Sequence, residues 1–441
     1  MSANNDLVHV VFFAGAIWGH ARPAVQVSIT LCRRSPNLVI SLLVPENLVP
    51  KAKKAIDLML AEATSDASLA GDWERMHSEP QELPRPSMLM VDLFTEYERE
   101  HIKSINDVPI IFWWSANLDY FVFHFGPDGI GGLGPLFLKA LDISNGDERE
   151  KEQGELWATT LRDVATVGDL PPIYQYEHMC SRMPTPPGSG FLMNICTSSA
   201  LKKVDGYMVA SGSWIEPEAH KIAKAHFDDT LKKPTYFVNL QISADKDVGS
   251  PERIAALSPP EKEILTFLDD ALAKHGADAA WVPQEAVLKH KALGAFITHG
   301  GWNSTSEAIA SATPMIFWPF AIDQPLVASM LSDKSEPAGW QLYETRGPTL
   351  SDFPLYHFKE GPKTSALGES IPVPTGTPEA LRAEFERVLI REAAAGSPEL
   401  KKRKERMLAL RERFIESTRP GAEAHQSISD LLSPIGCTIR A

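Results

Sequence analysis

Short apolar runs alternate with helical patterns through the first half of the chain, and this alternation limits the folds open to it. The runs lie at 8–13, 37–44, 88–92, 108–114, 205–211 and 235–240. Helical patterns fill 47–62, 94–105 and 216–228, and a further helix is expected to open at Pro23, because proline is favoured at the first helical position. Strands that alternate with helices form parallel sheets. The sequence therefore predicts an α/β fold.

The chain length predicts two domains. At 441 residues the chain exceeds what one hydrophobic core usually supports. The polar segment 241–260, with its Pro, Ser and Asp residues, is typical of a linker. We expect an N-terminal domain over 1–240 and a C-terminal domain over 261–441. The second domain would begin with a helix at 261–276 and end in helices between about 377 and 433, the last of which can pack back on the first domain.

Charge and cysteine usage narrow the class of partner. The net charge is −14, from 43 basic and 57 acidic residues, which argues against nucleic acid or an anionic membrane as the main partner. The 4 cysteines are widely spaced and form no CxxC pair, as in a reducing compartment. We see no signal peptide and no apolar run of the ~20 residues that a membrane span needs. A cytoplasmic monomer is expected.

One stretch, "FITHGGWNSTSEA" from Phe296 to Ala308, carries more than a plain corner requires. An apolar strand-like run leads into two glycines, which allow positive φ and a close approach of the backbone. Asn303 or Ser304 can cap the helix that follows, and a helix N-terminus favours an anion. An isolated glycine pair more often indicates tight packing, so the choice between tight packing and an anion-binding corner depends on the neighbouring residues.

Two other motifs are weaker candidates. "GIGGLG" at 129–134 matches G-x-G-x-x-G, but "GPD" and Pro135 flank it, so it lacks the strand and helix of a dinucleotide site. We expect a flexible loop there. "DKD" at 245–247 supplies too few ligands for a magnesium site and is better explained as solvated linker. No metal site is predicted.

The wider segment from Trp281 to Gln324 resembles the 44-residue donor-binding signature of family 1 UDP-glycosyltransferases of the plant and fungal type. The matching positions are Trp281, Gln284, His299, Gly301, Trp302, Asn303, Ser304, Glu307, Pro314, Asp323 and Gln324, with Val282 beside them. Gly300 stands where the family usually has cysteine. The resemblance implies a GT-B fold, in which two Rossmann-like domains with parallel sheets face a cleft. It also implies a UDP-sugar, above all UDP-glucose, as donor substrate, and no bound cofactor.

The resemblance assigns a role to each part of this signature. An indole such as that of Trp281 can stack on uracil, and Glu307 would accept hydrogen bonds from the ribose. His299, Asn303 and Ser304, with the helix N-terminus, would bind the diphosphate. Asp323 and Gln324 would bind the sugar hydroxyls and Trp302 would line the sugar pocket, with Gln324 favouring glucose.

A catalytic pair is expected in the first domain. "GAIWGHARP" resembles the family loop that carries the catalytic histidine, which places His20 in that role. An imidazole can deprotonate an acceptor hydroxyl, and a carboxylate can hold its tautomer. Asp92, at the end of the 88–92 run, is the expected partner, and Asp119 is the alternative. The aromatic residues Trp18, Phe94, Trp113, Trp114 and Phe121 either line an apolar acceptor pocket or belong to the core.

The chain departs from the family pattern just before the signature. Relatives normally have a strand that ends in a phosphate-binding loop between the linker and the signature tryptophan. Here "ILTFLDDALAKHGADAA" runs directly into "WVPQ". The C-terminal domain would then be shortened and would lack a phosphate-binding Ser or Thr.

The implied reaction is metal-independent, inverting transfer of a hexose to a hydroxyl of a small lipophilic acceptor. The alternatives are an inactive homologue or splice product that binds a ligand without transfer, and another GT-B enzyme such as a UDP-sugar epimerase or hydrolase.

Overall fold

A computed structural model shows the chain as two compact units, each described here by itself. Unit 1 comprises Met1–Asp169, Pro184–Gln241 and Ser417–Ala441, and unit 2 comprises Leu170–Met183 and Ile242–Glu416. The structure describes residues 6–63, 83–93, 95, 107–142, 163–179, 196–198, 200–242, 262, 266, 284–290, 292–351, 353–365 and 368–440.

In its described residues, unit 1 is built on a six-stranded parallel sheet in the order β2-β1-β3-β4-β7-β8. Its strands are β1 (Val8–Phe13), β2 (Leu38–Leu43), β3 (Pro86–Val91), β4 (Ile110–Trp114), β7 (Gly206–Val209) and β8 (Thr235–Phe237). Each lies at a predicted apolar run. All residues of β4 and β7 are buried, as expected of parallel strands with both faces covered. The predicted α/β class is confirmed.

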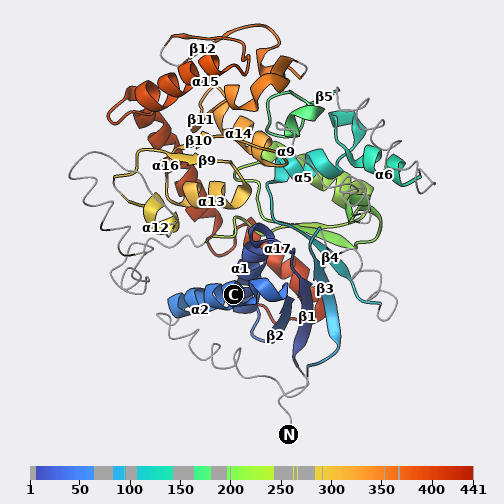
Figure 1. The fold of residues 1–441 in the computed structure, drawn as a ribbon. Helices are drawn as coiled ribbons and strands as arrows, with labels where there is room; N and C mark the ends of the chain where they lie inside the picture. The colour runs from blue at the N-terminus through green and yellow to red at the C-terminus, as the bar shows by residue number, and fades with distance from the viewer. Residues whose placement is uncertain are drawn as a thin grey trace. The chain divides into compact units, whose positions relative to one another are not determined.

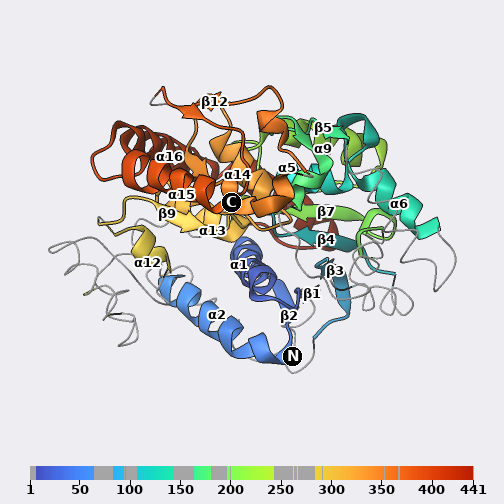
Figure 2. The same cartoon turned by 45° about the horizontal axis from the view of Figure 1, so that its top comes forward.

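Helices accompany these strands in unit 1, as Figures 1 and 2 show. They are α1 (Trp18–Arg34), η1 (Glu46–Leu48), α2 (Val49–Ala63), α5 (Leu118–Phe125), η2 (Asp128–Ile130), α6 (Gly134–Asp142), α9 (Pro217–Ala223), the π-helical η4 (Lys224–Thr230), α17 (Glu423–Leu432) and η8 (Ser433–Ile435). A short strand, β5 (Val164–Ala165), also belongs to this unit. The last long helix, α17, packs beside β8, where the Phe237 N–H donates to Ser427 Oγ.

The predicted start of the first helix at Pro23 is wrong. Helix α1 begins at Trp18, and Pro23 lies inside it. The carbonyl of Ile17 accepts hydrogen bonds from His20 N and Ala21 N, both at 3.0 Å, so the first turn is closed before the proline is reached. A proline at the sixth helical residue still removes an intrahelical donor, but it does not prevent the preceding turn from forming. His20 therefore lies in the first turn of a helix and not in a loop.

The "GIGGLG" motif connects two helices. It runs from η2, through Gly131 with φ 76°, into the start of α6 at Gly134. The element before it is α5, so no strand leads into the motif. This confirms that the motif is not the strand-to-helix corner of a dinucleotide site.

Unit 2 contains a three-stranded parallel sheet in the order β11-β10-β9 among its described residues. The strands of this sheet are β9 (Phe296–Thr298), β10 (Met315–Phe317) and β11 (Gly339–Gln341). Unit 2 also contains the short strands β6 (Ile173–Tyr174), β12 (Lys363–Thr364) and β13 (Ser370–Ile371). Its helices are η3 (Gln175–His178), α12 (Gln284–Leu288), α13 (Trp302–Ala310), α14 (Gln324–Ser332), η5 (Glu344–Ser351), η6 (Tyr356–Phe358), α15 (Pro378–Phe385), η7 (Glu386–Glu392) and α16 (Pro398–Ser417). The predicted helical series from 377 to 433 is confirmed. Within the described part of the chain, no helix is long and apolar enough to cross a membrane.

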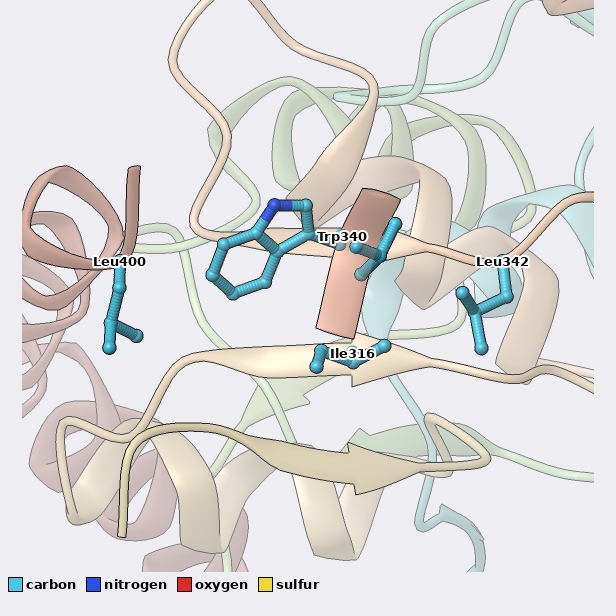
Figure 3. Packing of buried hydrophobic residues seen from close by; sticks show 5 residues of the cluster. Ile316, Trp340, Leu342 and Leu400 are labelled. Atoms are coloured by element: carbon cyan, nitrogen blue, oxygen red, sulfur yellow. The ribbon is translucent and has the colours of Figure 1, made fainter. Parts of the chain in front are cut away.

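The core of unit 2 forms around Trp340 of β11 (Figure 3). Its indole packs with Ile316 of β10 and Leu400 of α16, and its ring N–H donates to Glu392 Oε2 at 2.8 Å. The Arg403 guanidinium lies 4.1 Å from the ring centroid and donates to the Gly339 carbonyl. Helix α16 is thus fixed to the sheet by apolar packing and by a cation–π contact.

Helix α16 offers a matched test of this packing. Leu400 is 5% exposed, whereas Leu408 of the same helix is 48% exposed. We expect Leu400→Ala to lower the thermal midpoint of unit 2 by roughly 5–15 °C, through lost transfer energy and a cavity. Leu408→Ala should shift it by less than about 2 °C. Equal shifts in the two variants, measured by tryptophan fluorescence, would contradict the packing described.

Candidate functional site

The first candidate site in unit 1 is a hydrogen-bonded pair, His20 and Asp92. His20 Nδ1 lies 3.0 Å from Asp92 Oδ1 and 2.9 Å from Oδ2. The carboxylate is 1% exposed and the imidazole 26% exposed. A carboxylate at Nδ1 stabilises the tautomer that carries its proton there, which leaves the lone pair on Nε2. The arrangement can therefore act as a general base.

Parallel pairing of β1 and β3 brings the two side chains together. Phe13 at the end of β1 is in register with Val91 at the end of β3, and Asp92 N donates to the Phe13 carbonyl at 3.0 Å. His20 follows β1 on the first turn of α1. The carboxyl ends of neighbouring parallel strands are where ligand-binding groups collect in open α/β sheets.

Gly15 permits the close approach of this pair. A Cβ at this position would lie 2.7 Å from Asp92 Oδ1 and 2.8 Å from His20 Cβ, closer than real Cβ contacts. The sequence analysis did not single out Gly15. No local sequence pattern marks this glycine, because the crowding carboxylate of Asp92 is distant in the sequence.

The alternative carboxylate, Asp119, has a different contact. It is 0% exposed near the start of α5, and its Oδ1 accepts a hydrogen bond from Asp169 N at 2.8 Å.

Three of the aromatic residues considered for an acceptor pocket, Trp113, Trp114 and Phe121, are buried in the core of unit 1. Trp18 is partly buried, and Phe94 lies outside the described residues.

The second candidate site, in unit 2, is formed by the corner between β9 and α13. Gly300 has φ +85°, which confirms the expected left-handed backbone, whereas Gly301 has φ −62°. A Cβ at Gly301 would come within 2.6 Å of His299 Nε2, so this glycine leaves space for the imidazole. The His299 side chain is exposed, and partial desolvation lowers its pKa.

The expected capping of α13 by Asn303 or Ser304 is wrong. Helix α13 begins at Trp302, so both residues lie within its first turn, and its N-cap, Gly301, has no side chain to offer. Asp323 Oδ2 accepts from the Trp302 N–H at 3.1 Å instead. A carboxylate at this position complements the helix dipole. Ser304 Oγ accepts from Gln284 Nε2 at 3.4 Å, so the structure brings these two predicted residues together.

Asp323 and Gln324 lie at the end of a loop over 318–324 that follows β10. Gln324 Oε1 accepts from Phe320 N at 2.9 Å and from Ala321 N at 3.4 Å, which folds the loop back on the start of α14. Ile322, which lies between Ala321 and Asp323 in this loop, has φ 71°. That conformation is rare for a β-branched residue and needs support from its surroundings. The Ile322 N–H donates to the His178 carbonyl at 2.7 Å.

The remaining predicted residues divide into two groups. Trp302 and Glu307 on α13 are described and are each 3% exposed. The other group lies outside the described residues: Trp281 and Val282, the "DKD" motif at 245–247, most of the predicted helix at 261–276 and the expected linker beyond Ile242, together with the junction where the chain departs from the family pattern.

Comparison with known proteins gives a family match in the same region. Residues 269–342 match the family described as "UDP-glucoronosyl and UDP-glucosyl transferase". UDP-glycosyltransferase 76G1 of Stevia rebaudiana is 52% identical over 65 residues, which are 15% of this chain and 14% of that protein. 7-Deoxyloganetin glucosyltransferase of Gardenia jasminoides is 50% identical over 70 residues, 16% of this chain and 13% of that protein. The matched part thus spans only about a seventh of these relatives.

Solved structures resemble the whole chain. The structure of Phytolacca americana UGT2, complexed with UDP-2fluoro-glucose and pterostilbene, aligns over 97% of this chain and 99% of its own, with a TM-score of 0.56 and 17% identity. Medicago truncatula UGT71G1, complexed with UDP-glucose, aligns over 98% of this chain and 100% of its own, with a TM-score of 0.58 and 15% identity. At such identities the likeness establishes the fold, which is GT-B.

Gly15 can be tested against a second glycine of the same segment. Gly15→Ala should separate His20 from Asp92, because the new methyl group would overlap both side chains. Gly19→Ala is the control, since a Cβ there meets nothing within 4 Å and alanine favours a helix. We expect the imidazole ¹⁵N shifts of His20 to change in the first variant only. Unchanged shifts in Gly15→Ala would contradict the crowding.

The buried imidazole of His178 predicts a pH effect on the stability of unit 2. Burial lowers the pKa of His178 to about 4, whereas the unfolded chain has a value near 6.5. The unfolded state therefore binds more protons between these values, and the free energy of unfolding falls by up to about 3 kcal/mol as pH drops from 6.5 to 4. His178→Gln should lose less stability over this range in urea titrations. An identical loss in both proteins would argue against a neutral, buried His178.

Proposed function

We propose that the chain transfers a hexose from a UDP-sugar to a hydroxyl group of a small lipophilic acceptor, because residues 269–342 match the family described as "UDP-glucoronosyl and UDP-glucosyl transferase" and the fold is GT-B. The observation that carries the proposal is the donor segment, in which the family match over 269–342 includes all the described candidate residues of unit 2. Glucose is the proposed sugar, because several curated relatives are named as glucosyltransferases.

We assign the donor to the corner after β9 and to the loop after β10. His299 and the first turn of α13, with Asn303 and Ser304, would bind the diphosphate through side-chain donors and the helix dipole. Trp281, Val282 and Gln284 would hold the uridine, with Glu307 on the ribose. Asp323 and Gln324 would accept and donate hydrogen bonds at the sugar hydroxyls, and Trp302 would line the sugar pocket.

We assign the proton transfer to His20. Its Nε2 would take the proton of the acceptor hydroxyl while the oxygen attacks C1 of the sugar, and the bond from C1 to the UDP oxygen breaks as UDP leaves. Attack from the face opposite UDP inverts the configuration at C1. Asp92 would hold the tautomer and stabilise the imidazolium that forms. The support for this assignment is the bidentate contact at Nδ1, with distances of 3.0 and 2.9 Å.

Replacing the base gives the direct test. His20→Ala should lower kcat with UDP-glucose and a phenolic acceptor by about 10²–10⁴-fold, because general base catalysis typically contributes that factor. Affinity for UDP should change less than about twofold. His226→Ala, which removes a half-buried histidine of η4 in the same unit, is the control and should keep wild-type turnover.

The outcomes separate the proposal from its alternatives. Wild-type turnover in His20→Ala would overturn the assignment of the base. Donor binding without product, over a broad panel of hydroxyl acceptors, would identify a homologue that binds without transfer. Consumption of UDP-glucose in the absence of any acceptor would indicate an epimerase or hydrolase.

A further inference from the structure

Residues 171–179, called here the bracing segment, contact the loop that carries Asp323 and Gln324. The segment belongs to unit 2, although the chain on both sides of Leu170–Met183 belongs to unit 1. It contains β6 and η3, and its His178 carbonyl accepts the hydrogen bond from Ile322 N at 2.7 Å. The donor residue is the one immediately before Asp323.

Glu177 fixes the bracing segment to the rest of unit 2. Its Oε1 accepts from Tyr174 N and from Tyr356 N, each at 2.9 Å, so one oxygen joins η3 to η6. Its Oε2 faces Arg346 Nη1 at 3.8 Å, and both side chains are buried. Burial raises the pKa of this carboxyl, and the Arg346 charge opposes that effect.

Aromatic contacts hold the exposed side of the same segment. The Tyr176 hydroxyl donates to the Pro354 carbonyl, and its ring packs edge-on against Phe353 with centroids 5.3 Å apart. Tyr174 stacks on Tyr176 and contacts Tyr356, with both centroid separations at 5.2 Å. The segment is therefore attached at several points along its length.

The space between the bracing segment and α14 is nearly filled. Pro171, Pro172, Ile173 and Glu177 face Pro325, Leu326 and Ser329 of α14 across a cavity of about 10 Å³. That volume holds at most about one water molecule. The contact is protein packing, so a change in the segment is transmitted to the start of α14 and to the loop before it.

The backbone of Ile322 needs this support. A β-branched residue at φ 71° is held only where the surroundings determine its conformation. On one side the His178 carbonyl holds its N–H, and on the other the Asp323 carboxylate is held by Trp302 N. Without the first contact, the loop could relax to an ordinary backbone conformation and turn Asp323 and Gln324 away.

We propose that the bracing segment positions the sugar-recognition residues, with Glu177 as its main positioning residue and His178 and Ile322 as the contact that transmits its effect. The proposal rests on the proposed function, because it assigns the sugar of a UDP-sugar to Asp323 and Gln324. It predicts that damage to the segment weakens recognition of the sugar and leaves recognition of the nucleotide intact.

The test compares UDP with UDP-glucose on Glu177→Ala by calorimetric titration of the full chain. We expect the Kd for UDP-glucose to rise roughly tenfold, as a few hydrogen bonds are lost, while the Kd for UDP stays within about twofold. Glu177→Gln should restore the wild-type ratio, because one amide oxygen can accept from both Tyr174 N and Tyr356 N. Glu360→Ala removes an exposed carboxylate of the same unit and is the control.

Equal weakening of both ligands in a folded Glu177→Ala, or no weakening of either, would overturn the proposal. If Glu177→Ala does not fold, Tyr176→Phe replaces it, because that change removes only the hydroxyl contact to Pro354. We expect this variant to raise the KM for UDP-glucose about threefold at constant UDP affinity. An unchanged ratio of the KM for UDP-glucose to the Kd for UDP would overturn the proposal. A wild-type chain that binds neither ligand would instead refute the proposed function itself.

Discussion

Parallel pairing of neighbouring strands is the constraint on which both candidate sites depend. In unit 1 the register of β1 with β3 places the end of one strand beside the end of the other, and Asp92 then reaches His20. In unit 2 the register of β9 with β10 places the His299 corner beside the loop over 318–324, and Asp323 then reaches the N-terminus of α13. If the two strands were antiparallel, their carboxyl ends, and with them these groups, would lie at opposite ends of the strand pair.

Much of this fold could be predicted from the sequence because parallel strands are buried on both faces. They are near-continuous apolar runs, and such runs at 8–13 and 108–114 became β1 and β4. The two errors have different causes, the first local and the second distant in the sequence. Pro23 lies within α1 because Ile17 closes the first turn, and the cap expected from Asn303 or Ser304 is supplied by Asp323.

The functional details that the sequence did not indicate share this long-range origin. Gly15 is crowded by the side chain of Asp92, which follows another strand, and Ile322 is held by a carbonyl from a segment about a third of the chain length earlier. Neither contact leaves a local pattern of spacing or polarity. The donor signature could be recognised because the residues that we propose for the nucleotide sugar are close together in the sequence, around one strand-to-helix corner and the loop after the next strand.

The contrast between sequence and fold similarity agrees with the proposed function. Identity reaches 52% over a stretch of 65 residues, whereas whole-chain structural alignments stand at 15–17%. Under the proposed function, the segment that binds the nucleotide sugar would tolerate few changes, while the unit that binds the acceptor could diverge in its loops and still keep its parallel sheet.

Calorimetric titration of the full chain with UDP, and then with UDP-glucose, tests the central claim most directly. The account predicts micromolar binding of both ligands, and no comparable heat from ADP or GDP, because the uridine site is built into the donor segment. A folded, monodisperse protein that binds neither UDP nor UDP-glucose would contradict it.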